Sequence, residues 1–279
     1  MKNILSFCLL LGLFTPHADA QSVLWKISGN GLDKPSYLFG TIHLICAGDF
    51  EIKPKVKAAL ESADKYVVET DLFSPEAMQV LQASAISKEP QSKRLDPATY
   101  RELDSILRKF LKTPLEKFDH FTLATINSIM AIATFPCTDL KQYEAELLKL
   151  ANARGIKLDT LESVEAQLMF FNKTFTDDYT ISQIKDFEEN AGIMRNMIAY
   201  YKAEDLQRLY REMTADKSMD QNAKHWLLHV RNANWAKKMP AMMQKGSNFF
   251  AVGTAHLGGE DGLIRLLQNQ GYTVEPILN

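Results

Sequence analysis

The sequence predicts an α/β fold in which one mixed sheet is formed from the N- and C-terminal segments and is covered by a large helical insertion. Short apolar runs typical of strands lie near both ends of the chain, whereas apolar residues in the middle recur at helical spacing. The last two of these runs enclose a helix, which is the crossover pattern of parallel strands. We expect one domain over residues 21–279, with the helical insertion at about residues 73–245.

The N-terminal elements are expected in the order strand, strand, helix, strand. The apolar runs 23–27 and 36–39 are separated by a segment that contains glycine and proline, so they predict a hairpin with a long turn. Pro54 can occupy the first turn of a helix, and apolar residues then recur at helical spacing. Residues 66–72, which begin with Tyr-Val-Val, predict the third strand.

The rest of the chain is mainly helical until the last strands. Helical patterns cover residues 73–155 and continue through Gln244, with a short strand predicted between them at 156–161. The final elements are a strand, a helix closed by a glycine and a last strand, predicted at residues 248–252, 262–270 and 272–277. We therefore expect the two ends of the chain to meet in one sheet.

The composition indicates a globular protein with a substantial core. Of the 279 residues, 46% are hydrophobic and 24% are charged, which excludes a disordered chain. The 32 Lys and Arg residues nearly balance the 34 Asp and Glu residues, and the formal net charge is −2. Because the protein has no overall basic field that would hold a polyphosphate, we expect no nucleic-acid partner.

Residues 1–20 have the residue order of a secretory signal peptide. Lys2 is followed by an apolar run over residues 4–14 and then by Ala18-Asp19-Ala20, so we expect cleavage after Ala20. A membrane-spanning helix needs about 20 apolar residues, so this run is too short to cross a bilayer, and no later stretch qualifies. We therefore expect a periplasmic or secreted protein with no transmembrane segment after cleavage.

The cysteines fit an oxidising compartment. Cys8 lies in the signal peptide, so Cys46 and Cys137 remain as an even pair. We expect a disulfide between them. Two unrelated buried thiols are the alternative, because the sequence does not give the Cα separation that a disulfide requires.

A short repeated motif carries the main candidate residues. Gly40-Thr41-Ile42-His43 and Gly253-Thr254-Ala255-His256 share the pattern Gly-Thr-x-His, and each follows an apolar strand. A glycine there lets the backbone turn sharply or approach a ligand, and the histidine then stands at the edge of the sheet, where sites form in open α/β folds. A lone histidine is more often structural, so it is the repetition that makes this pair candidates.

Carboxylates are expected near these histidines. Glu69 and Asp71 lie two residues apart in the predicted strand 66–72 and therefore on one face, where a buried carboxylate needs a cation or hydrogen bonds. Glu162 follows the predicted strand 156–161 and begins a helix, where its charge also stabilises the helix N-terminus. Two neutral imidazoles with one or two carboxylates suit a divalent ion such as Zn, Mn, Co or Fe.

A second pair of histidines offers an alternative metal site. His225 and His229 lie four residues apart on a predicted helix, the spacing used by zinc hydrolases, but Trp226 stands where those enzymes carry the general-base glutamate. We interpret them as ordinary surface histidines. Arg231 lies about 200° around the helix from His229, so it faces elsewhere. It could bind a substrate carboxylate, balance the acids or form a surface ion pair.

Taken together, these motifs resemble the TraB/GumN family, which includes the Tiki-type proteases. The resemblance spans nearly all of the mature chain and rests on an ordered set: both Gly-Thr-x-His motifs, Val-Val-Glu-Thr-Asp at 67–71, Leu-Glu-x-x-x-x-Gln at 161–167 and Arg231-Asn232. It implies an α/β domain distantly similar to ChaN-like and erythromycin-esterase-like proteins. It also implies that the family's signature positions fall on His43, Glu69, Glu162, Arg231 and His256.

The resemblance also implies two kinds of function. Tiki-type members resemble divalent-metal-dependent peptidases, with Mn or Co, whereas ChaN-like relatives bind haem. Our main hypothesis is a secreted or periplasmic metal-dependent hydrolase, most specifically a peptidase, acting on a peptide or small-molecule substrate. The alternative is a non-catalytic protein that binds haem, a peptide or a partner on the same fold.

The hypothesis assigns a role to each candidate residue. One divalent ion, which is Mn, Co or Zn, would be held by His43, Glu69 and His256. Glu162 would act as general acid and base or as a further ligand, and Arg231 would orient the substrate or stabilise negative charge. The chain would pass close to the ion at two glycines, Gly40 and Gly253.

Overall fold

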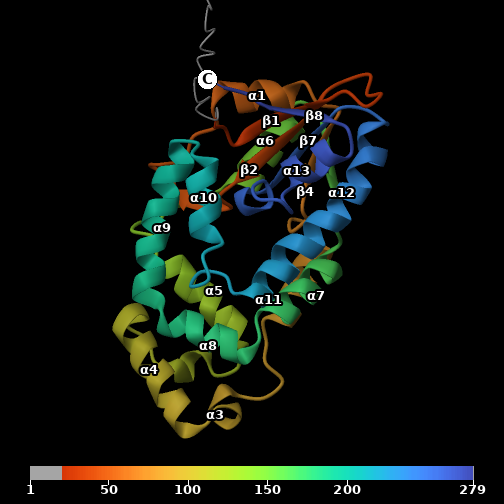
Figure 1. Cartoon of the computed structure of the whole chain (residues 1–279). Helices are drawn as coiled ribbons and strands as arrows, with labels where there is room; N and C mark the ends of the chain where they lie inside the picture. The colour runs from red at the N-terminus through yellow and green to blue at the C-terminus, as the bar shows by residue number, and fades with distance from the viewer. Residues whose placement is uncertain (1–20, 279) are drawn as a thin grey trace, which may run out of the picture.

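The centre of the molecule is a six-stranded mixed sheet (Figure 1). The computed structural model describes residues 21–278, so the predicted signal peptide lies outside the described residues. The strand order is β6-β4-β7-β2-β1-β8, and a separate two-stranded sheet pairs β3 with β5. The strands are β1 (Leu24–Ser28), β2 (Ser36–Thr41), β3 (Leu44–Cys46), β4 (Lys65–Val68), β5 (Leu140–Gln142), β6 (Lys157–Thr160), β7 (Asn248–Gly253) and β8 (Thr273–Pro276). The predicted α/β class, with a sheet formed from both ends of the chain, is confirmed.

Four neighbouring strands of the main sheet, β6, β4, β7 and β2, run parallel to one another. β1 is antiparallel to β2, which confirms the predicted hairpin, and β8 is antiparallel to β1. The two C-terminal strands run in the same direction and are joined through α13 (Leu263–Asn269), as predicted for a crossover, but they do not pair with each other. β2 and β1 lie between β7 and β8, because β7 pairs with β2 and β4 while β8 pairs with the outer side of the hairpin.

The third predicted strand is shorter than expected. β4 ends at Val68, so Glu69 and Asp71 do not share one face of a strand. The side chain of Asp71 accepts a hydrogen bond from the backbone N–H of Phe73, which is a local Asx turn that bends the chain. The backbone carbonyl of Glu69 still accepts from the N–H of Glu162 (2.8 Å), so Glu69 lies at the carboxyl end of β4, beside the end of β6.

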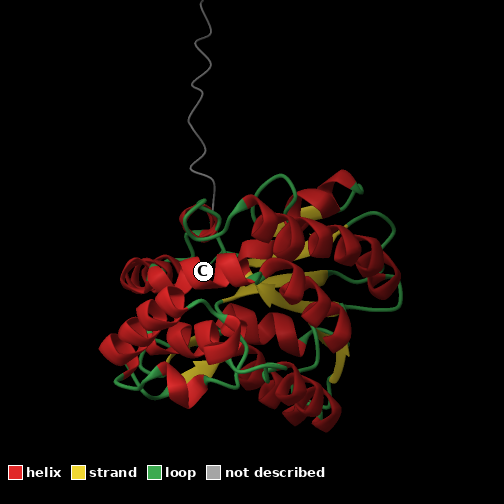
Figure 2. Ribbon diagram, turned by 90° about the horizontal axis from the view of Figure 1, so that it is seen from below, coloured by secondary structure: helices red, strands yellow, loops and turns green. Residues whose placement is uncertain are grey.

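Helices cover both faces of the sheet (Figure 2). Alternate residues of β7 belong to different cores: Phe249 and Ala251 pack on one face, and Phe250 and Val252 on the other. The described helices are α1 (Pro54–Glu61), α2 (Pro75–Ser84), α3 (Gln91–Arg94), α4 (Pro97–Leu111), α5 (Leu123–Ala133), α6 (Tyr143–Ala153), α7 (Val164–Thr174), α8 (Asp177–Lys185), α9 (Phe187–Lys202), α10 (Leu206–Met213), α11 (Gln221–Ala223), α12 (Val230–Met243) and α13 (Leu263–Asn269). Helices α1, α6 and α9 contribute to the first core, and α12 and α13 to the second.

Part of the helical insertion forms a third core away from the sheet. Leu103 and Leu107 of α4 pack there with Ile126 of α5 and Ile184 of α8. These helices lie at the end of the molecule opposite the sheet, drawn at the bottom of Figure 1. The insertion also contains β6, which returns to the main sheet and forms its edge. The insertion therefore begins and ends beside the strands that carry the candidate residues.

The predicted disulfide is confirmed. Cys46 at the end of β3 is bonded to Cys137, and their Cα atoms are 5.9 Å apart, within the range that disulfides require. Together with the β3–β5 pairing, this bond attaches the segment after His43 to the segment before α6. In the described part of the chain, every helix is too short or too polar to cross a membrane.

Candidate functional site

Four parallel strands end at one edge of the sheet, and each is followed by a predicted site residue. His43 follows β2, Glu69 follows β4, Glu162 follows β6 and His256 follows β7. Carboxyl edges of parallel strands are where open α/β sheets form their sites. A cavity of about 1060 Å³ opens at this edge, and its lining includes both histidines, Glu69 and Arg231.

The two Gly-Thr-x-His motifs lie side by side. Thr41 of β2 is opposite Gly253 of β7, and the hydroxyl of Thr254 donates to the backbone carbonyl of Thr41 (2.7 Å). A Cβ atom at Gly253 would lie 2.9 Å from Nε2 of His43, so only glycine leaves room for that ring. At Gly40 the nearest atoms to such a Cβ belong instead to Leu257 and Thr254, at 3.1 Å. Gly253 therefore leaves space for the His43 ring, while Gly40 lets the chain pack closely against Leu257 and Thr254.

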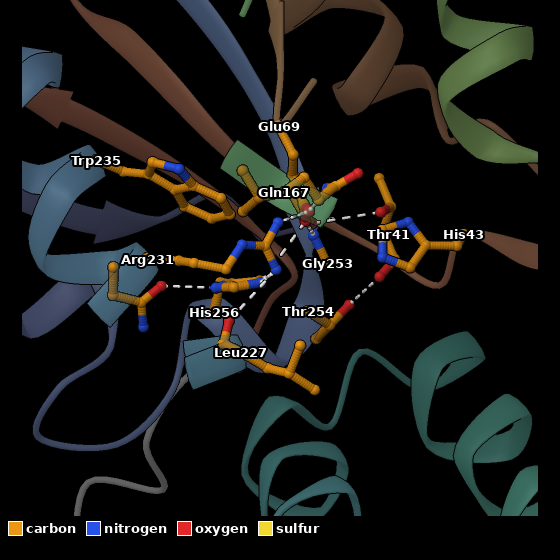
Figure 3. Close-up of polar contacts among 12 residues, drawn as sticks. Thr41, His43, Glu69, Gln167, Leu227, Arg231, Trp235, Gly253, Thr254 and His256 are labelled. Atoms are coloured by element: carbon orange, nitrogen blue, oxygen red, sulfur yellow. Dashed lines mark hydrogen bonds and ion pairs between the residues drawn. The ribbon is translucent and has the colours of Figure 1, made fainter. Parts of the chain in front are cut away.

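Glu69 accepts hydrogen bonds with both carboxylate oxygens (Figure 3). Its Oε1 accepts from the backbone N–H of Gly253 (2.7 Å), and its Oε2 accepts from Arg231 and from Nε2 of Gln167 (3.3 Å). Burial raises the pKa of this carboxyl, but Arg231 and the two histidines more than offset it and hold the pKa well below its usual range. The group is therefore a buried anion with a fixed position.

Arg231 is the central cation of the site. Its side chain is 3% exposed and forms ion pairs with Glu69 and with Glu162 (2.7 Å). Its Nη1 also lies 3.3 Å from the backbone carbonyl of Leu227 and 3.3 Å from Nε2 of His256. A π-helical turn, Lys224–His229, precedes α12 directly. Such turns are frequent at functional sites.

Glu162 lies behind Arg231. Its Oε2 accepts from Nε1 of Trp235 (3.0 Å), its Oε1 accepts from Arg231, and the carboxylate is not part of the cavity lining. Burial raises the pKa of Glu162, although Arg231 partly opposes the shift. A raised pKa suits proton transfer. The contacts favour a different use, in which Glu162 and Trp235 hold the guanidinium in place.

His256 is buried and neutral. Its Nδ1–H donates to Oδ1 of Asn232 (2.6 Å), which leaves Nε2 as an acceptor, 3.7 Å from Oε1 of Glu69. Burial lowers the pKa of His256 to about 3, with a further lowering contribution from Arg231, while Glu69 opposes the shift. Nε2 therefore keeps its lone pair over the ordinary pH range, and in this structure that lone pair faces Nη1 of Arg231 at 3.3 Å.

His43 faces the same space from the other side of Glu69. Its Nδ1 is 2.7 Å from Oε1 of Glu144, and its Nε2 points toward Gly253. Partial desolvation in the site lowers the pKa of His43, but the Glu144 carboxylate outweighs this effect and raises the pKa to about 9, so the ring is protonated at neutral pH. Since the side chain is 58% exposed, water screens the pair and limits its contribution to stability.

The donor types at this edge fit a divalent ion. Both imidazoles direct Nε2 to the cavity while Nδ1 is engaged by a side-chain oxygen, which is the usual arrangement of histidine ligands. Glu69 adds a carboxylate between them. Nevertheless, within residues 21–278 no three His, Cys, Asp or Glu side chains are arranged as an ion-binding group. An ion here would compete with Arg231 for Nε2 of His256 and for Glu69.

The structure also shows site residues that the sequence reasoning missed. Gln167 and Asn232 belong to the motifs that suggested the family, but they had no assigned role. Glu144 had no signal, because a carboxylate in the first turn of a helix such as α6 is explained by the helix dipole alone.

The alternative histidine pair lies on the π-helical turn and away from the strand ends. Nε2 of His229 is 3.7 Å from the carboxylate of Asp261, and His225 packs edge-on against Trp226. Neither histidine lines the large cavity.

Comparison with known proteins places the chain in a family. A family model described as the TraB/PrgY/gumN family matches residues 23–276. Metalloprotease TIKI2 of Danio rerio is 23% identical over 321 residues, which cover 92% of this chain and 61% of that protein. Metalloprotease TIKI1 of Danio rerio is also 23% identical, covering 94% of this chain and 64% of that protein.

A third relative, metalloprotease TIKI2 of Xenopus tropicalis, is 21% identical over 325 residues and covers 95% of this chain. The chain spans about three fifths of the length of these curated relatives. No solved structure matches the chain significantly.

Proposed function

The chain belongs to the TraB/PrgY/gumN family, and from this premise we propose that it is a divalent-metal-dependent hydrolase that cleaves peptides. The curated relatives reported above are named metalloproteases. One observation carries the proposal: His43, Glu69 and His256 come from the ends of three neighbouring parallel strands and face one large cavity. The three residues are far apart in the sequence, so only the pairing of the strands brings them together.

In this proposal His43, Glu69 and His256 hold the ion, which is Mn, Co or Zn. A divalent ion supplies Lewis-acid polarisation of a carbonyl and activation of water. Asn232 and Glu144 orient the two imidazoles through Nδ1, so that Nε2 of each ring faces the cavity. The proton on Nε2 of His43 and the contact of Nε2 of His256 with Arg231 would both be replaced when an ion binds. Gly253 donates its backbone N–H to Glu69 and leaves room for His43.

Arg231 is the proposed substrate-orienting residue. It lines the cavity, keeps its charge at every working pH and is held by Glu69 and Glu162 on its inner side. A fixed cation beside the reacting carbonyl stabilises the negative charge that develops during hydrolysis. Glu162 enters the proposal as the group that holds Arg231, because its carboxylate does not reach the cavity.

The size and lining of the cavity support a peptide substrate. Its volume of about 1060 Å³ exceeds the range of about 300–1,000 Å³ that is usual for small-ligand sites. The wall next to Arg231 is apolar and includes Phe171 of α7, Leu227 and Leu228. The lining also includes Ser87, Lys88 and Glu89 from the segment after α2. An extended chain with apolar and polar side chains fits such a surface.

The test is cleavage of a peptide library by the purified chain without residues 1–20. The protein is freed of metal with a chelator and then supplied with Mn, Co or Zn, and the products are identified by mass spectrometry. We expect cleavage only with added metal, its loss in His256→Ala, and its retention in His225→Ala. Cleavage that persists in the chelator and in His256→Ala would contradict the proposal, and peptide binding without any cleavage would favour the non-catalytic alternative.

A further inference from the structure

We propose that Glu144 is a positioning residue, which fixes the imidazole of His43 so that Nε2 faces the cavity. The inference rests on the proposed function, since it explains how one of the proposed ligands is held. Glu144 follows β5 in the first turn of α6, and its side chain reaches the end of β2. It does not line the cavity, so its effect on the site passes through His43.

One carboxylate oxygen of Glu144 contacts both Thr41 and His43. Oε1 of Glu144 accepts from the hydroxyl of Thr41 (2.6 Å) and lies 2.7 Å from Nδ1 of His43. Both partners belong to the first Gly-Thr-x-His motif, so one oxygen holds two of its side chains. With Nδ1 as the donor, the ring orientation is set and Nε2 is turned toward Gly253.

The other carboxylate oxygen indicates that the Glu144 side chain is not buried for packing alone. Oε2 of Glu144 is buried, and it has no hydrogen-bond partner among the described residues. A buried carboxylate with an unsatisfied oxygen reduces stability. If this position served only the core, a neutral side chain would make the protein more stable than a carboxylate does. We infer that this loss of stability is tolerated because Oε1 of the same carboxylate holds the His43 ring.

The backbone around this pair is held as well. The N–H of Tyr143 donates to the carbonyl of His43 (3.0 Å), and the hydroxyl of Tyr66 donates to the carbonyl of Glu144 (3.1 Å). His43 has a φ of +30°, a conformation that non-glycine residues rarely adopt and that the surroundings must impose. The start of α6 therefore fixes both the main chain and the side chain of His43.

The second motif contains a matching arrangement. Nδ1 of His256 donates to Oδ1 of Asn232, from α12, at 2.6 Å. Each repeated histidine thus has its Nδ1 bonded to a side-chain oxygen that comes from a helix distant in the sequence. Because the same atom is engaged in both rings, the same atom, Nε2, is left for the cavity. This repetition argues that the Glu144 contact serves the site.

The test compares crystal structures and Co²⁺ binding of Glu144→Ala, Glu144→Met and Glu144→Gln with those of the unsubstituted protein. Met fills the space of Glu without an acceptor, so it keeps the experiment decisive if the Ala variant fails to fold. Gln retains an acceptor oxygen for Nδ1. Glu146→Gln is the matched control, because Glu146 lies on the same helix and its ion pairs among the described residues are with the partly exposed Lys141 and the exposed Lys149. Co²⁺ affinity is measured by calorimetry and ligand geometry by visible absorption.

We expect the His43 ring to leave its position in the Ala and Met variants and to keep it in the Gln and control variants. Co²⁺ affinity should fall about 10- to 100-fold in Ala and Met, the usual effect of losing a partner of a histidine ligand, and by less in Gln. An unchanged ring in both Ala and Met would overturn the inference. If even the unsubstituted protein neither binds Co²⁺ nor cleaves peptides, the proposed function fails, while the ring position still decides the role of Glu144.

Discussion

The guanidinium of Arg231 and the carboxylate of Glu69 form a buried ion pair at the carboxyl edge of the sheet, with side chains only 3% and 11% exposed. The same guanidinium pairs with Glu162, whose side chain is 7% exposed. One cation therefore compensates two buried carboxylates. This relationship ties the stability of the sheet edge to the residue that we propose binds substrate.

Replacing Arg231 with Met should be strongly destabilising. It would leave Glu69 and Glu162 as buried charges without their cation, and breaking a buried pair in this way costs about 3–5 kcal/mol. Arg265→Met is the control, since its pair with Glu260 is 51% and 86% exposed and should contribute less than about 1 kcal/mol. Chemical denaturation measures both losses, and similar small losses for the two variants would refute the central position of Arg231.

Gly253→Ala should impair the site without unfolding the protein. The backbone of Gly253 has a φ of −54°, which alanine adopts readily, but the new Cβ would lie 2.9 Å from Nε2 of His43. We expect the ring to be displaced and the rate of peptide hydrolysis to fall about 100-fold, as small misplacements in catalytic sites do. Gly48→Ala, with no atom within 4 Å of the new Cβ, should retain activity. Full activity of Gly253→Ala would show that His43 does not act at this position.

The stability of the protein should depend on pH through Glu204. Burial raises the pKa of this carboxyl, but Lys53 and Lys55 more than offset it, so the folded pKa is lowered. Because the unfolded pKa is about 4.3, the pairing stabilises the fold above that pH and is lost as pH falls through the folded value.

Glu204→Gln should therefore be less stable than the unsubstituted protein by about 1–3 kcal/mol at pH 7. The difference should shrink as pH falls below about 4, because the carboxyl is protonated first in the unfolded chain and, at lower pH, in the folded protein as well. Denaturation curves at several pH values measure the difference, and a constant gap from pH 7 to pH 3 would exclude this role.

The Cys46–Cys137 disulfide should contribute to stability. It closes a segment of 91 residues, and the restriction of the unfolded chain by such a bond is typically worth about 2–4 kcal/mol. The double variant Cys46→Ser/Cys137→Ser should lose about that much free energy of unfolding. A reductant should lower the stability of the unsubstituted protein and leave the variant unchanged. Equal responses of the two proteins to reductant would mean that the bond is not formed in solution.

The sequence predicted the meeting of both chain ends, because the Gly-Thr-x-His motifs each follow an apolar strand and open α/β sheets place sites at such ends. It did not predict the strand order. Apolar runs identify β7 and β8 as strands, but they do not show that the β1–β2 hairpin separates the two. The end of β4 at Val68 was also missed, because the run 66–72 contains no glycine or proline that would mark it.

The contacts that orient the histidines could not be predicted for a different reason. Glu144 is 101 residues from His43 in the sequence, and only the path of the insertion brings α6 to the end of β2. A carboxylate in the first turn of a helix has a sufficient local explanation, so nothing in its sequence context marks it. Arg231 was placed correctly on a face away from His229, but its pairing with Glu69 required the fold.

The position of a bound ion tests the account most directly. Crystals of the chain without residues 1–20, grown with Mn²⁺, would be measured at a wavelength at which manganese scatters anomalously. We predict one strong peak at bonding distance from Nε2 of His43, Nε2 of His256 and a carboxylate oxygen of Glu69. A peak between His225 and His229 instead, or no peak at the strand ends with Mn²⁺ in excess, would contradict the proposed metal site.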